Sequence, residues 1–581
     1  MTNRLNWLAA RWQFNEHLYI SIIAILIGVL GGYGAVLFRY AIVFFQAVFY
    51  GNTQDFIKIS QEIPWYVKLV IPAVGGGLVG PIIYFLAREA KGHGVPEVME
   101  AVAMRGGHIR PRVTAVKIAA SAISIGCGGS VGREGPIVQI GSAVGSTVGQ
   151  ILKVSQDRMR TLVGCGAAAG IAATFNAPIA GVLFALEILL GEFGVTTFSP
   201  IVLSSVTATV ISRHYFGDYP ALIVPVYDMV SVWEFFLYAA LGIIVGLVAL
   251  LFVTTLYRTE DLFKAIPIPE YIKPVLGGLA MGVMIIYLPQ TFGVGYGAID
   301  LALTERMTIW ILLILIFAKI AATSITIGGG MSGGIFAPSL FIGAMTGGFF
   351  GSVTHALLPG LTASSGAYAL VGMGGLVAAA THAPITAILI IFELTSEYTI
   401  ILPLMITCIT ATLLATFLKK GNIYTLKLIR RGIVLHRGRE QSILQNILVS
   451  EVMRPEVRFV KENTFLTDVI KAFQDYNVSY LEVVDENDEL SGIISFRDIR
   501  QVMQEQQLGH LLIAKDVATS PVVTVTPDEN IEAVLRKMGL TGVSQLPVVD
   551  RHSPDRVIGV IHHKDVTAAY NRTALAMETE S

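Results

Sequence analysis

The sequence predicts an all-α polytopic membrane domain followed by a water-soluble C-terminal α/β module. Two observations support this fold class. Hydrophobic residues make up 53% of the 581 residues and charged residues only 14%, whereas about a quarter of the residues in a soluble domain are charged. The acidic residues are also unevenly distributed, because 20 of the 42 lie before residue 421 and 22 lie in the last 161 residues.

The predicted membrane domain is marked by long apolar runs. Several reach the roughly 20 residues that span a bilayer core, and others are interrupted by glycine or proline. Irregular backbone is tolerated at membrane depth where protein or a water-filled cavity satisfies its polar groups, so broken helices indicate a binding site near the midplane. The runs are Tyr19–Tyr50, Val67–Ala87, Val113–Val131, Thr161–Leu190, Val232–Tyr257, Tyr271–Leu288, Met307–Ile327, Tyr368–Leu394 and Thr399–Leu418.

The membrane domain contains an internal repeat. The segment AATFNAPIAGVLFALE ends at Glu187, and the related segment AAATHAPITAILIIFE ends at Glu393. Upstream, a glycine-rich motif with Pro136 has a counterpart with Pro338. Two related halves are a common plan among transporters. We expect Glu187 and Glu393 to accept hydrogen bonds at the interface between the halves.

Three glycine-rich segments inside apolar sequence indicate the chemistry. They are Lys91–Pro96 (KGHGVP), Gly132–Pro136 (GREGP) and Gly334–Pro338 (GIFAP). Glycine lets backbone amides approach an ion, and proline favours the first turn of a helix. Helix N-termini carry free N–H groups and a partial positive charge, so several of them converging in the membrane would bind an anion and still release it. For any one motif, close packing of small residues between helices is the alternative.

Glu134 lies inside the second of these segments. A carboxylate at membrane depth is energetically costly and usually functional. Among anion-binding amides it can occupy the place of the anion and swing aside when it is protonated, so we predict that Glu134 is both a gate and a proton carrier. The alternative is a structural ion pair with Arg133.

A further motif, Asn422-Ile-Tyr424, follows the last apolar run. With GREGP and GIFAP in this order, the chain closely resembles the CLC family of chloride channels and proton–chloride exchangers over nearly its whole length. The resemblance implies two inverted repeats with broken and re-entrant helices, a homodimer in the lipid bilayer, and one pathway per subunit for chloride or other monovalent anions. It also implies an anion site built from His93, Gly94, Arg133, Glu134, Gly135, Ile335, Phe336 and Tyr424, with Glu134 as the gate.

Two positions depart from the pattern of that family. His93 stands where a serine usually touches the anion; an imidazole N–H can still donate, but the preference between chloride and nitrate stays open. Ile188 stands where exchangers commonly carry a second glutamate, and an apolar side chain cannot relay a proton. Glu192, one turn further, could substitute, although a solvated helix-end residue is the simpler interpretation. We therefore favour an uncoupled chloride channel slightly over a proton-coupled chloride antiporter.

The tail contains a second repeat. The segment DENDELSGIISFRDI, which begins at Asp485, matches DRHSPDRVIGVIHHKDV, which begins at Asp550. Apolar alternation and amphipathic periodicity around these segments predict short strands and helices. The predicted strands are Tyr480–Val484 and Val522–Val525, and the predicted helices are Asp468–Tyr476 and Ile531–Met538.

The repeated segments of the tail resemble the CBS motif, in which a Ser and an Asp hold a ribose. Ser495 and Asp498 complete this motif in the first copy, whereas the second keeps Asp565 but has His562 where Ser or Thr is usual. The resemblance implies binding of an adenine nucleotide (ATP, ADP or AMP) and no other cofactor. A CBS pair used only for dimer contact is the alternative.

The predicted domains are a transport domain over residues 1–420, a basic linker over 421–447, CBS modules over 448–507 and 512–572, and a tail over 573–581. Basic residues flank the first and the last apolar run, which predicts a cell membrane protein, in the plasma or inner membrane, with both ends in the cytoplasm.

Several functional classes are disfavoured. The net charge of −1 argues against a nucleic-acid partner. No phosphate-binding Walker loop, metal-ligand set or nucleophile–base constellation indicates an enzyme. A CBS-regulated divalent-cation transporter is a more remote alternative, because a hard cation needs several oxygen ligands along its pathway.

Overall fold

The structure is a computed structural model that describes residues 2–52, 56–218, 222, 224–225, 227, 229–431, 433, 444, 447–476, 478–500, 511–551 and 553–579. The chain divides into two compact units, Met1–Gly432 and Ile433–Ser581. Residues 434–443 of the predicted linker and 501–507 of the predicted first CBS module lie outside the described residues.

The first unit is helical, which confirms the predicted fold class of the membrane domain. Among the described residues, seven helices are long and apolar enough to cross a membrane, and four shorter apolar helices accompany them. The helices of the first half are α1 (Thr2–Tyr50), α2 (Phe56–Ile59), α3 (Trp65–Pro81), η1 (Ile82–Leu86), η2 (Arg88–Ala90), α4 (Val95–Met104), α5 (Arg112–Gly126), α6 (Glu134–Ile151), α7 (Gln156–Phe175), α8 (Pro178–Leu183), η3 (Phe184–Leu190) and α9 (Val195–Phe216).

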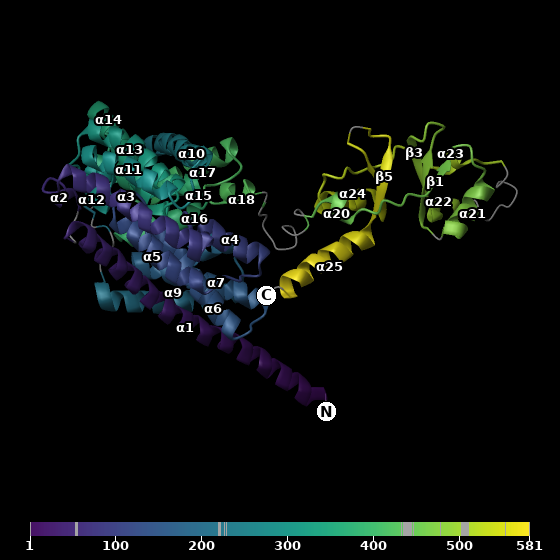
Figure 1. The fold of residues 1–581 in the computed structure, drawn as a ribbon, viewed down its shortest axis with the longest axis horizontal. Helices are drawn as coiled ribbons and strands as arrows, with labels where there is room; N and C mark the ends of the chain where they lie inside the picture. Colours follow the sequence, from purple (N-terminus) through teal and green to yellow (C-terminus); the bar gives the residue numbers. More distant parts are fainter. Residues whose placement is uncertain are drawn as a thin grey trace. The chain divides into compact units, whose positions relative to one another are not determined.

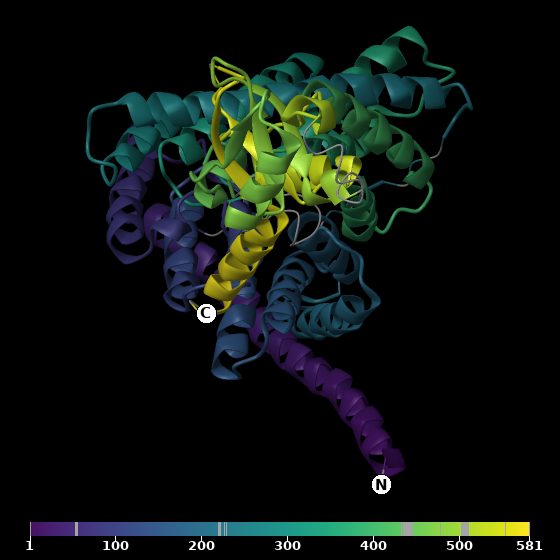
Figure 2. The ribbon, with the colours of Figure 1, turned by 90° about the vertical axis from the view of Figure 1, so that its right-hand side faces the viewer.

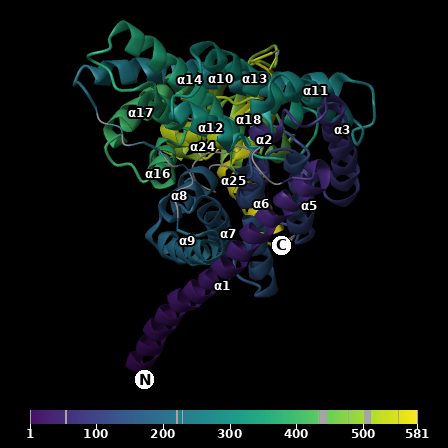
Figure 3. The same ribbon diagram turned by 90° about the vertical axis from the view of Figure 1, so that its left-hand side faces the viewer.

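The second half of the membrane unit has a similar succession of helices, most of which pack against one another. Figures 1 and 3 show most of its teal and green helices on one side of the membrane unit and most of the blue helices of the first half on the other, while the purple helix α3 lies beside α11 (Lys273–Tyr287). These helices are α10 (Glu234–Ala265), α11 (Lys273–Tyr287), η4 (Pro289–Thr291), α12 (Tyr296–Leu303), α13 (Ile309–Gly328), α14 (Phe336–Leu357), α15 (Ser365–Thr381), α16 (Pro384–Thr395), α17 (Ile401–Leu418) and α18 (Thr425–Ile429).

Two of the predicted apolar runs are broken helices. The run Thr161–Leu190 breaks after Asn176, whose φ is 58°, and the run Tyr368–Leu394 breaks after His382, whose φ is 53°. In both cases the next helix starts at a proline two residues later. The left-handed residue and the proline together stop one helix and start another, because neither continues an α-helical hydrogen-bond ladder.

The two halves cap each other reciprocally. The carboxylate of Glu187 accepts hydrogen bonds from the backbone N–H of Thr386 (2.7 Å) and its hydroxyl (2.6 Å) at the start of α16. In return, the carboxylate of Glu393 accepts from the N–H of Ile179 (3.0 Å) and of Ala180 (2.7 Å) at the start of α8. A carboxylate at a helix N-terminus satisfies free N–H groups and complements the helix dipole. The predicted structural role of both glutamates is confirmed.

Two buried lysines also make matching contacts. The Nζ of Lys117 donates to the carbonyls of Ala90 (3.0 Å) and Gly92 (2.8 Å). The Nζ of Lys319 in the second half donates to the carbonyls of Thr291 (3.2 Å) and Gly293 (2.9 Å). Each lysine therefore fixes the short 3₁₀ turn that precedes a glycine-rich loop.

The second unit has the α/β architecture that the sequence predicts. A three-stranded sheet has the order β1-β2-β3, and a two-stranded sheet pairs β4 with β5. Figure 2 shows the long helix α25 running away from these sheets. The elements are α20 (Val449–Val452), β1 (Phe459–Lys461), α21 (Leu466–Tyr476), β2 (Tyr480–Val484), β3 (Leu490–Ser495), α22 (Phe496–Arg500), α23 (Ala514–Val517), α24 (Ile531–Thr541), β4 (Gln545–Val549), β5 (Val557–His562) and α25 (His563–Thr579).

Three of the four elements predicted in the tail are confirmed. The exception is Val522–Val525, which is not a strand: only Val525 makes an isolated bridge, to Val548. This segment lies between Pro521 and Pro527. Val525 exchanges backbone hydrogen bonds with Pro547 (3.1 Å) and Val549 (2.9 Å), and apolar alternation alone does not specify a strand partner for the residues before it.

The two CBS modules are interlocked. Ile447, which precedes the first module, and Val449 and Val452, which lie at its start, are buried in the core of the second. Between the modules, the Glu482 carboxylate on β2 accepts a hydrogen bond of 2.8 Å from the Gln545 side chain on β4. Glu482 is only 1% exposed. Burial with one amide partner does not replace the water that an ionised carboxylate would have. The ionised form of Glu482 is therefore disfavoured in the folded protein.

Candidate anion pathway

The three glycine-rich segments singled out in the sequence meet in the structure. The N–H of Gly132 donates to the carbonyl of Gly334 (2.8 Å), and the N–H of Gly334 donates back to the carbonyl of Gly132 (2.6 Å). Gly92 exchanges two longer hydrogen bonds with Met331 and Gly333, each of 3.3 Å. These contacts bring the N-termini of α4, α6 and α14 together.

Glycine is required where these loops touch. A Cβ atom on Gly135 would lie 2.2 Å from the carbonyl oxygen of His93 and 3.0 Å from the Cα of Gly334. Gly94 has a φ of 85°, a conformation that L side chains rarely adopt. A side chain at Gly94 or Gly135 would therefore force the loops apart and separate the helix N-termini.

His93 and Tyr424 lie together on one side of this junction. Their ring centroids are 5.8 Å apart, and both residues are buried. The Nδ1 atom of His93 has no hydrogen-bond partner among the described residues. A buried ring nitrogen without a protein partner is costly, which favours a ligand at this position.

The start of α14 supplies the predicted backbone donors. Ile335 is the N-cap of this helix and Phe336 is its first residue, and both are buried. The first amides of a helix have no carbonyl partner within the helix. The amides of Ile335 and Phe336 thus face the junction that His93, Gly94 and Gly135 also reach.

Glu134 reaches across this junction. It is the first residue of α6 and is 1% exposed. Its Oε2 accepts a hydrogen bond from the N–H of Ala337 in the first turn of α14 (3.4 Å), and its Oε1 accepts from the hydroxyl of Tyr296 (3.2 Å). Arg133 donates elsewhere, to the carbonyl of Thr174 at 3.4 Å. The carboxylate of Glu134 therefore lies where helix N-termini would otherwise bind an anion.

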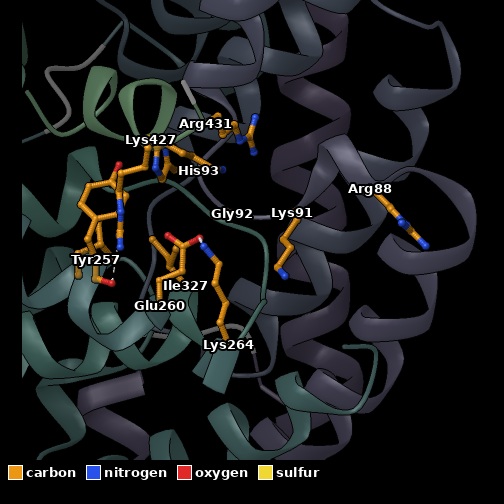
Figure 4. A pocket seen from close by; sticks show the side chains of 12 residues that line it. Arg88, Lys91, Gly92, His93, Tyr257, Glu260, Lys264, Ile327, Lys427 and Arg431 are labelled. Carbon is orange, nitrogen blue, oxygen red and sulfur yellow. Dashed lines mark hydrogen bonds and ion pairs between the residues drawn. The ribbon is translucent and has the colours of Figure 1, made fainter. Parts of the chain in front are cut away.

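A cavity of about 270 Å³ opens from His93. Figure 4 shows Lys91, Lys264 and Glu260 around one part of it and His93, Lys427 and Arg431 around another. Six basic side chains and a single acidic one contribute to its lining, and five of the basic side chains form ion pairs with carboxylates. The charged lining residues are Arg88, Lys91, Glu260, Lys264, Lys427, Arg430 and Arg431.

A charge network joins α18 to α4 beside the cavity. Lys427 donates to Glu97 at 2.7 Å, and these side chains are 12% and 10% exposed. Arg431 donates to Glu97 at 3.2 Å and to Glu100 at 3.0 Å. The sequence assigned the basic residues after the last span only to membrane orientation. Lys427, Arg430 and Arg431 follow Tyr424 within seven residues. This closeness in the sequence was the signal available for a role at the pathway.

The C-terminal end of the broken helix, in η3, carries the residue types on which the prediction about proton coupling depends. Ile188 is buried, at 7% exposure, and carries no titratable group. Glu192 is exposed in the turn between η3 and α9. An exposed carboxylate beyond the helix end fits the interpretation of Glu192 as a solvated residue better than that of a buried relay.

In the tail, the predicted ribose-binding groups have different surroundings. Asp498 accepts hydrogen bonds from the N–H (2.8 Å) and hydroxyl (2.7 Å) of Ser495 at the exposed start of α22. Asp565 instead accepts two hydrogen bonds from Arg454, of 2.9 and 2.5 Å. A bidentate guanidinium–carboxylate pair is among the stronger polar contacts. The second half-site thus holds its carboxylate in an ion pair with an arginine, whereas the carboxylate of the first is held by the neighbouring serine.

No group of three or more His, Cys, Asp or Glu side chains that could hold a metal ion occurs in the described part of the chain. The polar groups at the junction are amide, hydroxyl and imidazole donors with one carboxylate. This donor set suits an anion rather than a hard cation, which prefers six or more oxygen ligands.

Comparison with known proteins agrees with this chemistry. The profile described as "Voltage gated chloride channel" matches residues 75–416, and the CBS domain profile matches residues 449–505 and 514–572. A putative chloride channel protein ClcB-like of Ralstonia nicotianae is 37% identical over 412 residues, which are 70% of this chain and 96% of that protein. The H(+)/Cl(-) exchange transporter ClcA of Vibrio parahaemolyticus is 33% identical over 442 residues, 74% of this chain and 92% of that protein.

Solved structures support the same fold. A slow cyanobacterial Cl⁻/H⁺ antiporter has a TM-score of 0.65 and 28% identity, covering 71% of this chain and 97% of its own. A eukaryotic CLC transporter has a TM-score of 0.63 and 20% identity over 94% of this chain and 98% of its own, which shows a shared fold. With the repeat, the converging helix N-termini and the matched profile, this chain belongs to the voltage gated chloride channel (CLC) family and is a multi-pass membrane protein that carries a pair of CBS domains.

Proposed function

We propose that this protein transports chloride across the membrane through the junction of α4, α6 and α14, with Glu134 as the gate. The observation that carries the proposal is the position of the Glu134 carboxylate on the first turn of α14, hydrogen-bonded to the N–H of Ala337. An anion and a carboxylate compete for the same helix N-terminus. His93, Gly94, Arg133, Gly135, Ile335, Phe336 and Tyr424 complete the proposed site around this carboxylate.

Within this function, uncoupled chloride movement is our first candidate. Ile188 stands at the inner end of the broken helix, where it cannot take up a proton, and it is buried among apolar residues. Proton-coupled exchange is the second candidate. It is favoured by the presence of Glu134 and by relatives that are named H(+)/Cl(-) exchange transporters. The preference among chloride, nitrate and other monovalent anions depends on His93.

A reversal-potential measurement separates these candidates. Purified protein in liposomes under a chloride gradient should show a reversal potential equal to the chloride equilibrium potential, and an added pH gradient should leave it unchanged. A shift of the reversal potential with the pH gradient would establish exchange. Uphill proton movement driven by the chloride gradient, measured with a pH dye, would show the same. Absence of any chloride flux would reject the transport function itself.

We further propose a homodimer in a cell membrane, with both termini in the cytoplasm and one pathway in each subunit. The proposal rests on membership of a family whose transporters are dimers and on the basic residues that flank the first and the last apolar run. Cysteine accessibility at Thr2 and at Ser581 in sealed vesicles tests the orientation of the ends.

The CBS pair is proposed to bind an adenine nucleotide at the first half-site and to regulate transport. Asp498 is exposed, and within the described part of the chain its carboxylate is hydrogen-bonded to Ser495, whereas Asp565 is held by Arg454. We expect Asp498→Ala to weaken ATP or AMP binding by about tenfold or more, since it removes hydrogen bonds from a charged group.

The matched control for this prediction is Asp565→Asn, which should leave nucleotide affinity within about twofold because Asp565 already has its partner. Titration of labelled nucleotide against the unit Ile433–Ser581 measures both variants. If no saturable binding occurs at millimolar nucleotide, the tail serves only in dimer contact.

A further inference from the structure

The second half contains an unassigned counterpart of the first glycine-rich loop. Gly293-Val-Gly-Tyr-Gly297 corresponds to Gly92-His-Gly-Val-Pro96. The middle glycines Gly94 and Gly295 have φ values of 85° and 91°, and each is the N-cap of the following helix, α4 or α12. In each half a buried lysine donates a hydrogen bond to the carbonyl of the first glycine of the loop: Lys117 to Gly92 and Lys319 to Gly293. By this register, Tyr296 is the first residue of α12, as Val95 is of α4.

This loop delivers a hydroxyl to the gate. The Tyr296 hydroxyl donates a hydrogen bond of 3.2 Å to Oε1 of Glu134. The other carboxylate oxygen of Glu134 accepts from the N–H of Ala337 at 3.4 Å. The two oxygens of the gate are therefore held by two different helices, α12 and α14.

Two features around Tyr296 restrict its ring: the close packing of the preceding glycine and a guanidinium over the ring face. A Cβ on Gly295 would lie 2.7 Å from the Phe341 ring and 3.3 Å from Nζ of Lys319, so the backbone of this turn is tightly packed. The guanidinium carbon of Arg133 lies 5.4 Å from the centroid of the Tyr296 ring. A cation over an aromatic face is attractive, and here it fixes the ring that carries the hydroxyl.

We propose that Tyr296 is a positioning residue of the gate, whose hydroxyl holds the ionised carboxylate of Glu134 over the anion pathway and releases it on protonation. The inference rests on the proposed function, because it needs Glu134 to act as a gate. A hydrogen bond to an ionised acceptor is roughly twice as strong as one between neutral groups, so the hydroxyl favours the charged, seated form. The charged and titratable groups that surround Glu134 are Arg133, Tyr296, Lys319 on α13 and Tyr424.

The first test is the pH dependence of chloride flux in Tyr296→Phe. Flux rises on acidification as Glu134 is protonated and leaves the pathway. Without the hydroxyl the ionised carboxylate is seated less firmly, so we expect the half-maximal pH to move upward by on the order of one unit. Tyr287→Phe is the matched control, because Tyr287 is 78% exposed at the end of α11 and should leave the midpoint unchanged. An unshifted midpoint in Tyr296→Phe overturns the proposal.

The second test repeats Tyr296→Phe in a Glu134→Ala background. If the tyrosine acts through the gate, the substitution should have no further effect on flux there. A changed flux in that background would mean that Tyr296 binds the anion itself, and the positioning role would be wrong. If Glu134→Ala alone keeps the wild-type pH dependence, Glu134 is not the gate. This outcome rejects the proposed function and is distinct from the outcomes that reject the role of Tyr296.

A second pair of variants guards against misfolding. Should Tyr296→Phe not yield folded protein, Tyr296→Gln and Tyr296→Leu provide the same contrast, since only the amide retains a hydrogen-bond donor and neither side chain titrates. We expect the Gln variant to have a midpoint nearer to that of the wild type than the Leu variant has. Equal midpoints in the two variants would overturn the proposal.

Discussion

Replacing Glu134 with Ala should raise chloride flux at neutral pH and remove most of its pH dependence. The carboxylate occupies the first turn of α14, so its removal leaves the anion pathway open at every pH. Wild-type flux should rise by about tenfold or more between about pH 8 and pH 5, because above its pKa the protonated fraction of a carboxyl group grows about tenfold for each unit by which the pH falls. Chloride efflux from liposomes at a series of pH values measures the difference.

The matched control for this prediction is Glu192→Ala, which removes an exposed carboxylate from the same half of the membrane unit. This variant should keep the wild-type pH profile. A residual pH dependence in Glu134→Ala that disappears when His93→Ser is added would come from the imidazole. Full retention of the wild-type profile in Glu134→Ala would instead contradict the assignment of the gate.

Replacing Glu482 with Gln should stabilise the CBS unit at alkaline pH. Burial between β2 and β4 raises the pKa of Glu482 to about 7 in the folded protein, from an ordinary value of 4.5. Between these two pH values the folded state holds a proton that the unfolded chain has already lost, so the free energy of unfolding falls as pH rises. The loss amounts to about 3 kcal/mol above pH 7.

Glutamine preserves the hydrogen bond to Gln545 and cannot ionise. The Glu482→Gln unit should therefore resemble the wild type near pH 5 and exceed its stability by up to about 3 kcal/mol near pH 8. Urea denaturation of Ile433–Ser581 at both pH values measures the difference. Burial also lowers the pKa of His562, but this affects both proteins alike. Glu486→Gln, at an exposed position, is the matched control; parallel stability curves for Glu482→Gln and wild type would refute a buried ionisable group.

The sequence predicted most of the elements because their signals are local. Long apolar runs, Ala-Pro helix starts and amphipathic periods each act within one turn or one span, so α3, α11, α17, α21 and α24 were expected near their observed bounds. The strand predicted over Val522–Val525 failed because apolar alternation says nothing about pairing. A strand also needs a partner in register, and among the described residues only Val525 of this segment has one, at Val548.

The site residues divide in the same way. Glycine and proline motifs identified the helix N-termini, and Glu134 stood out among them because a carboxylate is rare inside apolar sequence. Tyr296 carried a weaker signal. Its loop repeats the first glycine-rich loop only in its glycines, and its contact with Glu134 joins residues that lie 162 positions apart. The pairing of Lys427 with Glu97 spans 330 positions and has no local signature.

The sequence by itself determined that this protein is a membrane protein with two related halves and a set of helix starts marked by glycine and proline, and its resemblance to a known motif indicated the CBS pair. These features depend on composition and short-range pattern, which any chain displays before it folds. Only the tertiary structure decided which groups hold one another: Tyr296 on Glu134, Arg454 on Asp565 and Lys427 on Glu97. Such contacts depend on how the backbone brings distant segments within about 3 Å, the range over which a hydrogen bond forms, and that geometry is set by packing of the whole unit.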